Sequence, residues 1–251
     1  GAMKLVEDRL DDVFVAANGD VFASIDVASE IREHVSTGAS VTIALTPVEN
    51  PCEFGIARVQ PDGRITEFKE KPKPEEVFSN LINAGVYVMN RAVLEYVPER
   101  TFYDFSKDLI PRLMQDGHRI QGFQISGIWM DVGRPHDLLG ANLAVAAAEY
   151  SGRSWDVGGS RVEGPFYMGD GARVSGSSIR DSVVLKGAEV SGSELDNALV
   201  MGGCVVDGAR VENAILGEGC MVGAGAVIRN AVLGDRAVVG PGETVDEGKR
   251  V

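Results

Sequence analysis

The first 150 residues alternate between short apolar runs and stretches in which apolar residues recur with helical spacing. A continuous apolar run of about four to eight residues is typical of a buried strand, whereas recurrence at every third or fourth position indicates a helix. This pattern predicts strands at residues 13–17, 41–45, 54–59, 64–68, 81–89 and 120–125, and helices at residues 25–35, 105–114 and 135–148. Such alternation predicts an α/β domain with a mostly parallel sheet, in which the first run is a buried parallel strand.

Prolines and glycines mark turns and boundaries between these predicted elements. The triplet Pro-Asp-Gly at residues 61–63 separates two strands and predicts a hairpin turn. Pro111 predicts a kink or a restart within a helix, and Pro135 stands at a helix start, where its missing N–H costs least. The stretch 151–164 is rich in Gly and Ser, and we interpret it as the linker between a first domain, 1–150, and a second domain within 151–251.

The second domain contains an internal repeat. Four segments align on one another, IRDSVVLKGAEV, LDNALVMGGCVV, VENAILGEGCMV and IRNAVLGDRAVV, and their first residues are 16, 16 and 17 positions apart. Three apolar columns run through the alignment, separated by Gly, Ser, Asn and Asp, which predicts three short strands per coil with tight corners between them. One coil cannot bury its inward residues alone, so the coils must stack into a solenoid.

Each column of the repeat has a structural interpretation. The three predicted inward ladders consist of Val174, Val190, Val206, Val222 and Val239, of Ile179, Leu195, Val211 and Ile228, and of Val183, Leu199, Ile215 and Val232. Glycines are expected at the corners, where φ is positive or backbones approach closely, namely Gly171, Gly187, Gly203 and Gly219. Cys204 and Cys220 share a column with alanines, so we interpret them as small inward or corner residues. The spacing resembles the hexapeptide repeat of left-handed β-helices, and only this resemblance implies the handedness.

Composition narrows the range of functions. Lys plus Arg number 24 and Asp plus Glu 37, which gives a formal net charge of −13. This balance argues against a nucleic-acid partner, which needs clustered basic residues, but it permits a small phosphorylated ligand. No apolar run reaches the length of about 18 residues that a membrane span needs. The three cysteines show no metal-binding spacing, and a cytoplasmic, reducing location fits them best.

Two motifs at predicted strand ends carry candidate chemistry. Asn18, Gly19 and Asp20 follow the first strand, at the edge of an α/β sheet where ligands bind. The carboxylate could hold Mg²⁺ and the glycine would admit a phosphate to the backbone, although such a triplet alone is most often a plain turn. Glu70 and Lys71 open an E-K-P motif in which Glu can accept sugar hydroxyls and Lys can clamp a phosphate. Such a pair alone is most often only solvated.

Two further motifs lie later in the first domain. Asn83 and Gly85 interrupt a strand that is otherwise apolar, either because a group must approach the backbone there or because the strand contains a bulge. Asp131 lies in the segment GIWMDVG, ahead of the helix that Pro135 begins. It could cap that helix, or it could share one Mg²⁺ ion with Asp20.

Taken in this order and ahead of hexapeptide coils, the four motifs resemble those of the sugar-1-phosphate nucleotidylyltransferase family. Members of that family carry an N-G-D or N-S-D aspartate that binds Mg²⁺, an E-K-P motif for sugar and phosphate, a sugar-contacting N-A-G strand and a second Mg²⁺ aspartate in W-x-D-x-G. All four motifs are matched over roughly residues 5–150. The segments SNLINAGVYV and GIWMDVGRPHDLL are most similar to mannose-1-phosphate guanylyltransferases and their archaeal relatives.

The resemblance implies a Rossmann-like nucleotidyltransferase domain followed by a left-handed parallel β-helix. Family members begin with a glycine-rich G-x-G-T-R loop and a following K-P lysine, which hold the nucleoside triphosphate, and neither motif is present in this sequence. We therefore expect the domain to be N-terminally incomplete, which would leave the strand at residues 13–17 at an exposed apolar edge. Either the sequence is a fragment or another polypeptide completes the sheet.

The activity implied by this resemblance is transfer of a nucleotidyl group from a nucleoside triphosphate to a hexose 1-phosphate, with release of pyrophosphate. A GDP-mannose-type product is favoured, and a dTDP- or UDP-glucose-type product is compatible. The resemblance assigns Mg²⁺ to Asp20 and Asp131 and the sugar phosphate to Lys71. The further substrate-binding residues that it implies are Asn18, Gly19, Glu70, Asn83 and Gly85.

Two other functions stay open at this point. The chain could be a regulatory or scaffolding subunit that keeps the fold without turnover, which the missing loop favours and the retained motif residues oppose. It could also be an acyltransferase seated on the β-helix, but such enzymes generally use a coil histidine, and His34, His118 and His136 all precede the repeats. The exposed ends of the solenoid favour a homo-oligomer.

Overall fold

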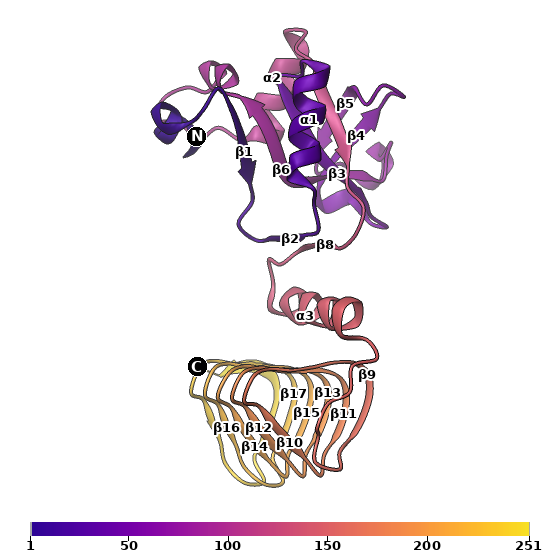
Figure 1. Ribbon diagram of the computed structural model, residues 1–251. Helices are drawn as coiled ribbons and strands as arrows, with labels where there is room; N and C mark the ends of the chain where they lie inside the picture. Colours follow the sequence, from indigo (N-terminus) through magenta and orange to yellow (C-terminus); the bar gives the residue numbers. More distant parts are fainter. Residues whose placement is uncertain (1, 251) are drawn as a thin grey trace. The chain divides into compact units, whose positions relative to one another are not determined.

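The computed structural model describes residues 2–250, and the chain divides into two compact units (Figure 1). One unit ends at Asp131 and the other begins at Val132. The sequence pattern placed the domain boundary after residue 150. The structure places it earlier because helix α3 (Pro135–Tyr150) packs on the solenoid and so belongs to the second unit. Among the described residues no helix is long and apolar enough to cross a membrane.

The first unit is built on a mixed sheet. Among residues 2–250 this sheet has six strands, in the order β5-β4-β6-β3-β7, with β1 also paired to β6. Their bounds are β1 (Val13–Ala17), β3 (Val41–Pro47), β4 (Gly55–Val59), β5 (Ile65–Glu70), β6 (Leu81–Asn90) and β7 (Ile120–Gln124). In this sheet β3 pairs in parallel with β7, whereas the other pairs are antiparallel. The prediction of a mostly parallel sheet was wrong, because β4, β5 and β6 follow one another without the helical crossovers that parallel pairing needs.

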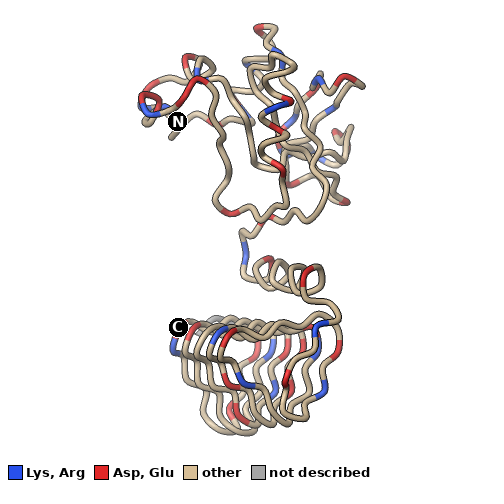
Figure 2. Tube along the Cα trace, in the orientation of Figure 1, with Lys and Arg blue, Asp and Glu red and all other residues tan. Residues whose placement is uncertain are grey.

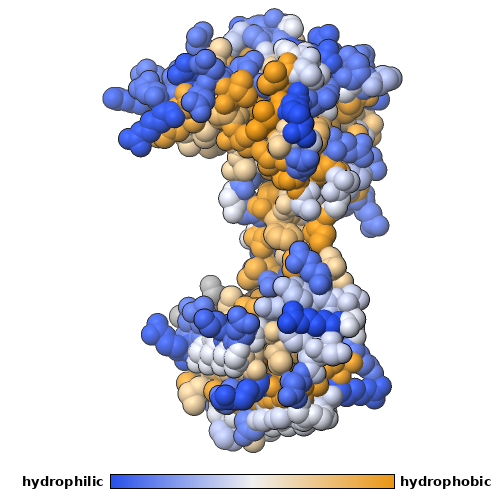
Figure 3. Space-filling view, viewed as in Figure 1, coloured by the Kyte–Doolittle hydropathy of each residue, from blue (hydrophilic) through white to orange (hydrophobic). Residues whose placement is uncertain are grey.

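Strand β1 lies at an edge of the sheet, as predicted for this apolar run. Its partner among the described strands is β6, and the pairing is antiparallel, so the prediction of a buried parallel strand was wrong. Phe14 and Ala16 face the core, whereas Val15 is 39% exposed on the opposite face. Figure 3 shows an apolar area over the region of β1 and α1. The exposed large hydrophobic residues of these two elements are Val15, Ile31 and Val35.

The helices of the first unit begin and end at the positions that local chemistry favours. Helix α1 (Val27–Thr37) is capped by the Asp26 carboxylate, which accepts from the Ser29 N–H at 3.0 Å, and it ends at Gly38 with φ +62°. Helix α2 (Ile110–Gln115) carries a proline in its first turn and follows a π-helical turn, so the predicted restart at Pro111 is confirmed. Short 3-10 helices occupy Ala2–Arg9, Pro51–Glu53, Pro74–Glu76 and Arg91–Tyr96.

The two faces of this sheet differ in chemistry. One face carries a continuous apolar core with Ile43, Met89 and Leu94, all fully buried. The other face is covered by α1, whose buried side chains are polar: the His34 ring bonds the Thr42 hydroxyl at 2.9 Å and the Asn90 side-chain oxygen at 3.1 Å. The buried residues of α1 are Glu30 and His34, so this helix buries polar rather than apolar side chains against the sheet.

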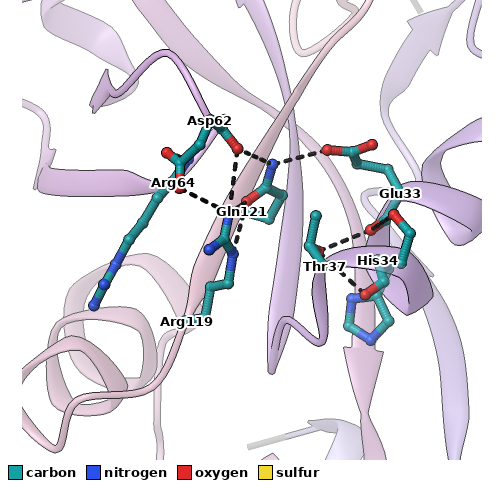
Figure 4. Close-up of polar contacts among 8 residues, drawn as sticks. Glu33, His34, Thr37, Asp62, Arg64, Arg119 and Gln121 are labelled. Carbon is teal, nitrogen blue, oxygen red and sulfur yellow. Dashed lines mark hydrogen bonds and ion pairs between the residues drawn. The ribbon is translucent and has the colours of Figure 1, made fainter.

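A polar network joins α1 to the hairpin turn and to β7 (Figure 4). The buried Gln121 amide donates to the Glu33 carboxylate at 2.9 Å and to the Asp62 carbonyl at 3.1 Å. Arg119 donates to the Gln121 side-chain oxygen and pairs with the Asp62 carboxylate at 3.1 Å. The predicted turn at residues 61–63 is thus confirmed, and its position is fixed by a strand that is distant in sequence.

Glu30 on α1 is fully buried, and within the described part of the chain neither of its carboxyl oxygens has a hydrogen-bond partner. Burial raises the pKa of this carboxyl from 4.5 to about 8, because the low-dielectric surroundings disfavour the charged form. The folded protein therefore keeps Glu30 neutral at pH values where the unfolded chain has already lost the proton.

We predict that this carboxyl weakens the fold as the pH rises from about 5 to 8. The unfolded state binds fewer protons than the folded state in this window, so the free energy of unfolding should fall by an amount of order 4 kcal/mol. The Glu30→Gln variant should lack this decline, whereas Glu99→Gln, at an exposed position, should keep it. Urea unfolding measured across pH 5–9 tests this, and parallel curves for wild type and Glu30→Gln would contradict it.

The second unit is a parallel β-solenoid with α3 packed on its side. Strands β10 (Arg173–Ser175), β12 (Glu189–Ser191), β14 (Val205–Asp207), β16 (Met221–Val222) and β18 (Val238–Val239) form one sheet. A second sheet contains β9 (Arg161–Met168), β11 (Ser178–Val184), β13 (Glu194–Val200), β15 (Arg210–Leu216), β17 (Val227–Leu233) and β19 (Thr244–Arg250). Each strand of the second sheet bends at a central residue with positive φ, such as Asn197 at +52°. Three short segments per coil are therefore confirmed.

Two of the three predicted ladders are confirmed as the core of the solenoid. The valine ladder from Val174 and the ladder from Ile179 stack in register in successive coils and are buried. Cys204 and Cys220 lie in the same core, and burial raises the pKa of the Cys204 thiol to about 12. Gly171, Gly187, Gly203 and Gly219 have φ between +67° and +71°, as expected at corners.

The third ladder was predicted to face inward, and that prediction was wrong. Val183, Leu199 and Ile215 face out of the coils and form a cluster with Leu139 and Ala146 of α3. The positive-φ residue in the middle of each strand reverses the alternation of side chains. Val183 therefore points outward, and Val184, the residue after it, points into the core. The outward ladder is buried because α3 covers it.

The start of the solenoid also differs from the prediction. The segment 151–164 was interpreted as a linker, but Trp155 and Val157 pack on the solenoid core and β9 begins at Arg161. Charged residues of both signs recur along the coils (Figure 2), and some pair between neighbouring coils, for example Arg180 with Asp196. Such exposed pairs contribute at most about 1 kcal/mol each, so the apolar core dominates the stability.

We predict that two leucines on one strand have separable roles. Leu195→Ala and Leu199→Ala should each lower the free energy of unfolding by about 2–5 kcal/mol, because both side chains are buried. Only Leu199→Ala should raise amide hydrogen exchange in α3, since Leu199 contacts the helix and Leu195 faces the coil interior. Equal exchange of α3 in the two variants would show that the outward ladder does not hold the helix.

Candidate active site

A cavity of about 780 Å³ opens in the first unit, beside the ends of several strands. Seven of the eight residues predicted for the site line it, and Gly19 is the one that does not. The seven come from four separate segments of the chain: Asn18, Asp20, Glu70, Lys71, Asn83, Gly85 and Asp131. Residues as far apart in sequence as Asn18 and Asp131 are therefore brought together by the fold.

A two-stranded ribbon brings the two predicted metal-binding carboxylates together. Strand β2 (Val21–Ala23) pairs antiparallel with β8 (Trp129–Asp131), and Val21 lies opposite Asp131. Asp20 immediately precedes Val21, so both carboxylates lie at the same end of the ribbon, and both line the cavity. Two carboxylates that line one cavity offer the oxygen ligands that a hard divalent cation prefers.

The N-A-G segment of β6 forms a bulge against β3. Ile43 pairs with Tyr87 and Leu45 pairs with Asn83, so the register shifts between these pairs. Gly85 has φ +75°, and a Cβ atom at this position would lie 2.8 Å from the Asn18 Nδ2 atom. The sequence left two interpretations of this glycine, a bulge or a close approach of another group to the backbone. The structure shows both, because the strand bulges and Asn18 lies against Gly85.

The side chain of Asn83 is held by three hydrogen bonds. Its oxygen accepts from the Gly85 N–H at 3.0 Å, and its nitrogen donates to the Tyr87 hydroxyl at 2.7 Å and to the Ser106 hydroxyl at 3.1 Å. Both amide hydrogens are thus engaged within the protein, and the oxygen keeps one lone pair. Asn83 can therefore only accept a hydrogen bond from a ligand.

Strand β5 ends at Glu70, and Lys71 follows it directly; both residues line the cavity. The Lys71 N–H donates to the Phe54 carbonyl at 2.9 Å, and its φ of +46° is unusual for a residue with a side chain. Burial, with a smaller contribution from the Asp104 carboxylate, raises the pKa of Glu70 above its ordinary value. The positive charge of Lys71 acts in the opposite direction.

The cavity has an acidic lining. Among the described lining residues five side chains are acidic and two are basic, the acidic ones being Asp20, Glu53, Glu70, Asp104 and Asp131 and the basic ones Lys71 and Arg100. Within residues 2–250 no group of three or more His, Cys, Asp and Glu side chains is placed to hold a metal ion. A cation at this site would therefore need further oxygen ligands from a substrate or from water, as is usual for Mg²⁺.

Sequence reasoning did not identify several groups that shape the cavity. Asp104 caps the turn that carries Ser106, with its carboxylate accepting from the Ser106 N–H at 2.8 Å. The Tyr87 ring packs edge-on against Phe105, with ring centroids 5.8 Å apart. An aspartate two residues before a serine is a capping signal that the sequence does contain, but nothing local places this turn beside β6.

The family described as nucleotidyl transferase matches residues 1–148, which is more than half of the 251-residue chain. The chain belongs to the nucleotidyl transferase family. A second family, described as the GlmU-like C-terminal hexapeptide, matches residues 188–248 of the solenoid. The resemblance inferred from the four motifs and the repeat is therefore confirmed.

Individual relatives of this nucleotidyl transferase differ in the substrates that their names give. A Sulfolobus acidocaldarius protein, provisionally named a mannose-1-phosphate guanyltransferase, is 31% identical over 193 residues, which cover 73% of this chain and 52% of the relative. A UTP–glucose-1-phosphate uridylyltransferase of Synechocystis is 29% identical, over 71% of this chain and 53% of the relative. A glucose-1-phosphate adenylyltransferase of Bacillus subtilis is 34% identical, over 50% of this chain and 35% of the relative.

These relatives support the family more strongly than any one substrate. The chain spans about half of the length of the first two and about a third of the third. Their names all describe transfer to a sugar 1-phosphate, but from three different nucleotides. The family is enzymatic, and the common reaction class is sugar-1-phosphate nucleotidyl transfer.

We predict that the bulge tolerates no side chain at Gly85. Gly85→Ala should cost the strain of a left-handed backbone and also displace Asn18, lowering the free energy of unfolding by about 2–4 kcal/mol. Gly117→Ala is the matched control, because Gly117 has φ +83° but no atom within 4 Å of the added Cβ. It should cost only about 1–2 kcal/mol. Urea denaturation measures both, and equal losses would show that the Asn18 contact contributes nothing.

Proposed function

We propose that this nucleotidyl transferase joins a nucleoside triphosphate to a hexose 1-phosphate, giving a nucleoside diphosphate sugar and pyrophosphate. The observation that carries the proposal is the cavity itself, which gathers seven predicted site residues from four segments. In this reaction a sugar-phosphate oxygen forms a bond to the α-phosphorus while the bond from that phosphorus to the leaving pyrophosphate breaks. Such a transfer depends on alignment and charge neutralisation rather than on a protein nucleophile.

We assign a Mg²⁺ ion to Asp20 and Asp131. The donor set fits, since both carboxylates line the same cavity near one end of the β2–β8 ribbon, and Mg²⁺ commonly takes one or two carboxylates together with phosphate oxygens and water. When bound, the ion would neutralise phosphate charge in a cavity whose charged lining residues are mostly acidic. The role of the two aspartates is to fix where that positive charge lies.

We assign the phosphate of the hexose 1-phosphate to Lys71 and the sugar hydroxyls to Glu70 and Asn83. Lys71 supplies a positive charge at the cavity wall, held there by its backbone bond to Phe54. Glu70 and Asn83 offer acceptors for sugar hydroxyls, and the fixed orientation of the Asn83 amide favours one hydroxyl geometry over others. Asn18, Gly19 and Gly85 would shape the backbone around the phosphates.

A GDP-mannose-type product remains our preferred assignment, with UDP- and dTDP-glucose types as the alternatives. It has the support of the segments around Asn83 and Asp131 and of the name of the Sulfolobus relative. We also expect self-association through the solenoid. Support comes from an exposed apolar column on three successive coils, formed by Val205, Met221 and Val238.

We predict that Asp131→Asn removes turnover. Loss of one of two metal-binding carboxylates should lower the rate of pyrophosphate release by at least about 100-fold, since several kcal/mol of charge stabilisation would be lost. Asp11→Asn is the matched control, because Asp11 is exposed and does not line the cavity. Pyrophosphate release is measured with GTP, UTP, dTTP and ATP, each paired with mannose 1-phosphate and glucose 1-phosphate.

The outcomes separate the candidate functions. Release with one pair that Asp131→Asn abolishes supports the proposal and identifies base and sugar. Near-normal release in Asp131→Asn would refute the metal assignment. Folded protein that releases no pyrophosphate with any pair would favour a regulatory or scaffolding subunit instead.

A further inference from the structure

We propose that Trp129 is a positioning residue for the carboxylate pair, acting through a hydrogen bond to the β6 bulge. This inference rests on the proposed function, because it concerns how Asp20 and Asp131 are held in place to bind a cation. It goes beyond that function by assigning a role to a side chain that would not itself touch the ion. The contacts of the ribbon carry the argument.

The bulge in β6 presents two consecutive carbonyls to the segments that carry the carboxylates. The Ala84 carbonyl accepts from the Trp129 indole N–H at 2.9 Å, and the Gly85 carbonyl accepts from the Asn18 backbone N–H at 2.8 Å. Each donor lies two residues before a carboxylate, Trp129 before Asp131 and Asn18 before Asp20. The two aspartates are thus anchored to adjacent points of the same strand.

The spacing of two residues has a geometric consequence on β8. Side chains at positions i and i+2 of a strand lie on the same face. The direction in which the Trp129 indole points therefore fixes the face on which Asp131 stands. Both side chains line the cavity, in agreement with this geometry.

The ribbon needs such an anchor. A two-stranded ribbon is only marginally stable by itself, and β2 and β8 pair over three residues each. The Trp129 ring also packs edge-on against Phe54, with centroids 5.4 Å apart, and joins an apolar cluster with Ala23 and Ile125. Ala84 is fully buried, so without the indole N–H its carbonyl would lose the hydrogen bond that Trp129 provides.

The test is the substitution Trp129→Phe, which keeps an aromatic ring and removes the N–H. The chain contains two tryptophans, and Trp155→Phe in the solenoid unit is the matched control. Mn²⁺ is the probe, and electron paramagnetic resonance of the free ion measures its binding without any need for turnover. We expect Trp129→Phe to weaken Mn²⁺ binding about tenfold, as is typical when a group that orients a metal ligand is removed. Trp155→Phe should leave the binding unchanged.

Two further measurements keep the test decisive. Thermal denaturation shows whether Trp129→Phe is folded. If it is not, Trp129→His replaces it. The histidine ring retains an N–H, so this variant should keep part of the Mn²⁺ affinity of the wild type. The Mg²⁺ concentration for half-maximal pyrophosphate release should rise in parallel, while the KM for the sugar 1-phosphate changes less than twofold. A purely structural defect would move both quantities together.

The failure of this inference differs from the failure of the proposed function. Wild-type Mn²⁺ affinity in a folded Trp129→Phe variant would overturn the role of Trp129, even if the wild type is active. Mn²⁺ binding that survives Asp131→Asn would overturn the role as well, because the site to be positioned would lie elsewhere. An inactive wild type in which Trp129→Phe still weakens Mn²⁺ binding would refute the function and support the positioning role.

Discussion

The arrangement of the candidate active-site cavity depends on one departure from regular pairing, the bulge at Ala84 and Gly85 of β6. Gly85 adopts a positive φ that brings the backbone against Asn18, and the bulge presents two carbonyls to the segments that hold Asp20 and Asp131. The Asn83 amide closes the same bulge by accepting from the Gly85 N–H. A regular strand would pair these groups with β3 instead, and the ribbon would have nothing to bond to.

The charged residues that line the cavity are mostly acidic, which affects how it could bind a phosphorylated ligand. Phosphorylated substrates carry negative charge, and most of the charged side chains on the described cavity wall do too. Under the proposed function, these carboxylates would serve the reaction only together with a positive charge that they position, which is the reason for assigning them to a divalent cation. Burial raises the pKa of Glu70, so its charge is disfavoured at the wall where hydroxyls, rather than phosphates, are expected to lie.

The solenoid shows a comparable use of local strain. One positive-φ residue in each long strand reverses the side-chain alternation, so a single strand supplies both an inward and an outward apolar ladder. The inward ladder packs coil on coil, and the outward one holds α3 through Leu139 and Ala146. Asn occupies several of these positions because it tolerates the left-handed region better than other residues with side chains.

The sequence by itself determined the repeat, most of the strands and helices, and the four motifs of the site, because periodicity and turn residues are local signals. The family followed from those motifs. Strand direction, the outward ladder and the packing of α3 were decided only in three dimensions, since each depends on partners far away in sequence. The same holds for Trp129 and Ser106. The hydrogen bond from the Trp129 indole to the Ala84 carbonyl cannot be predicted from the local sequence pattern, because only the fold brings these two residues together.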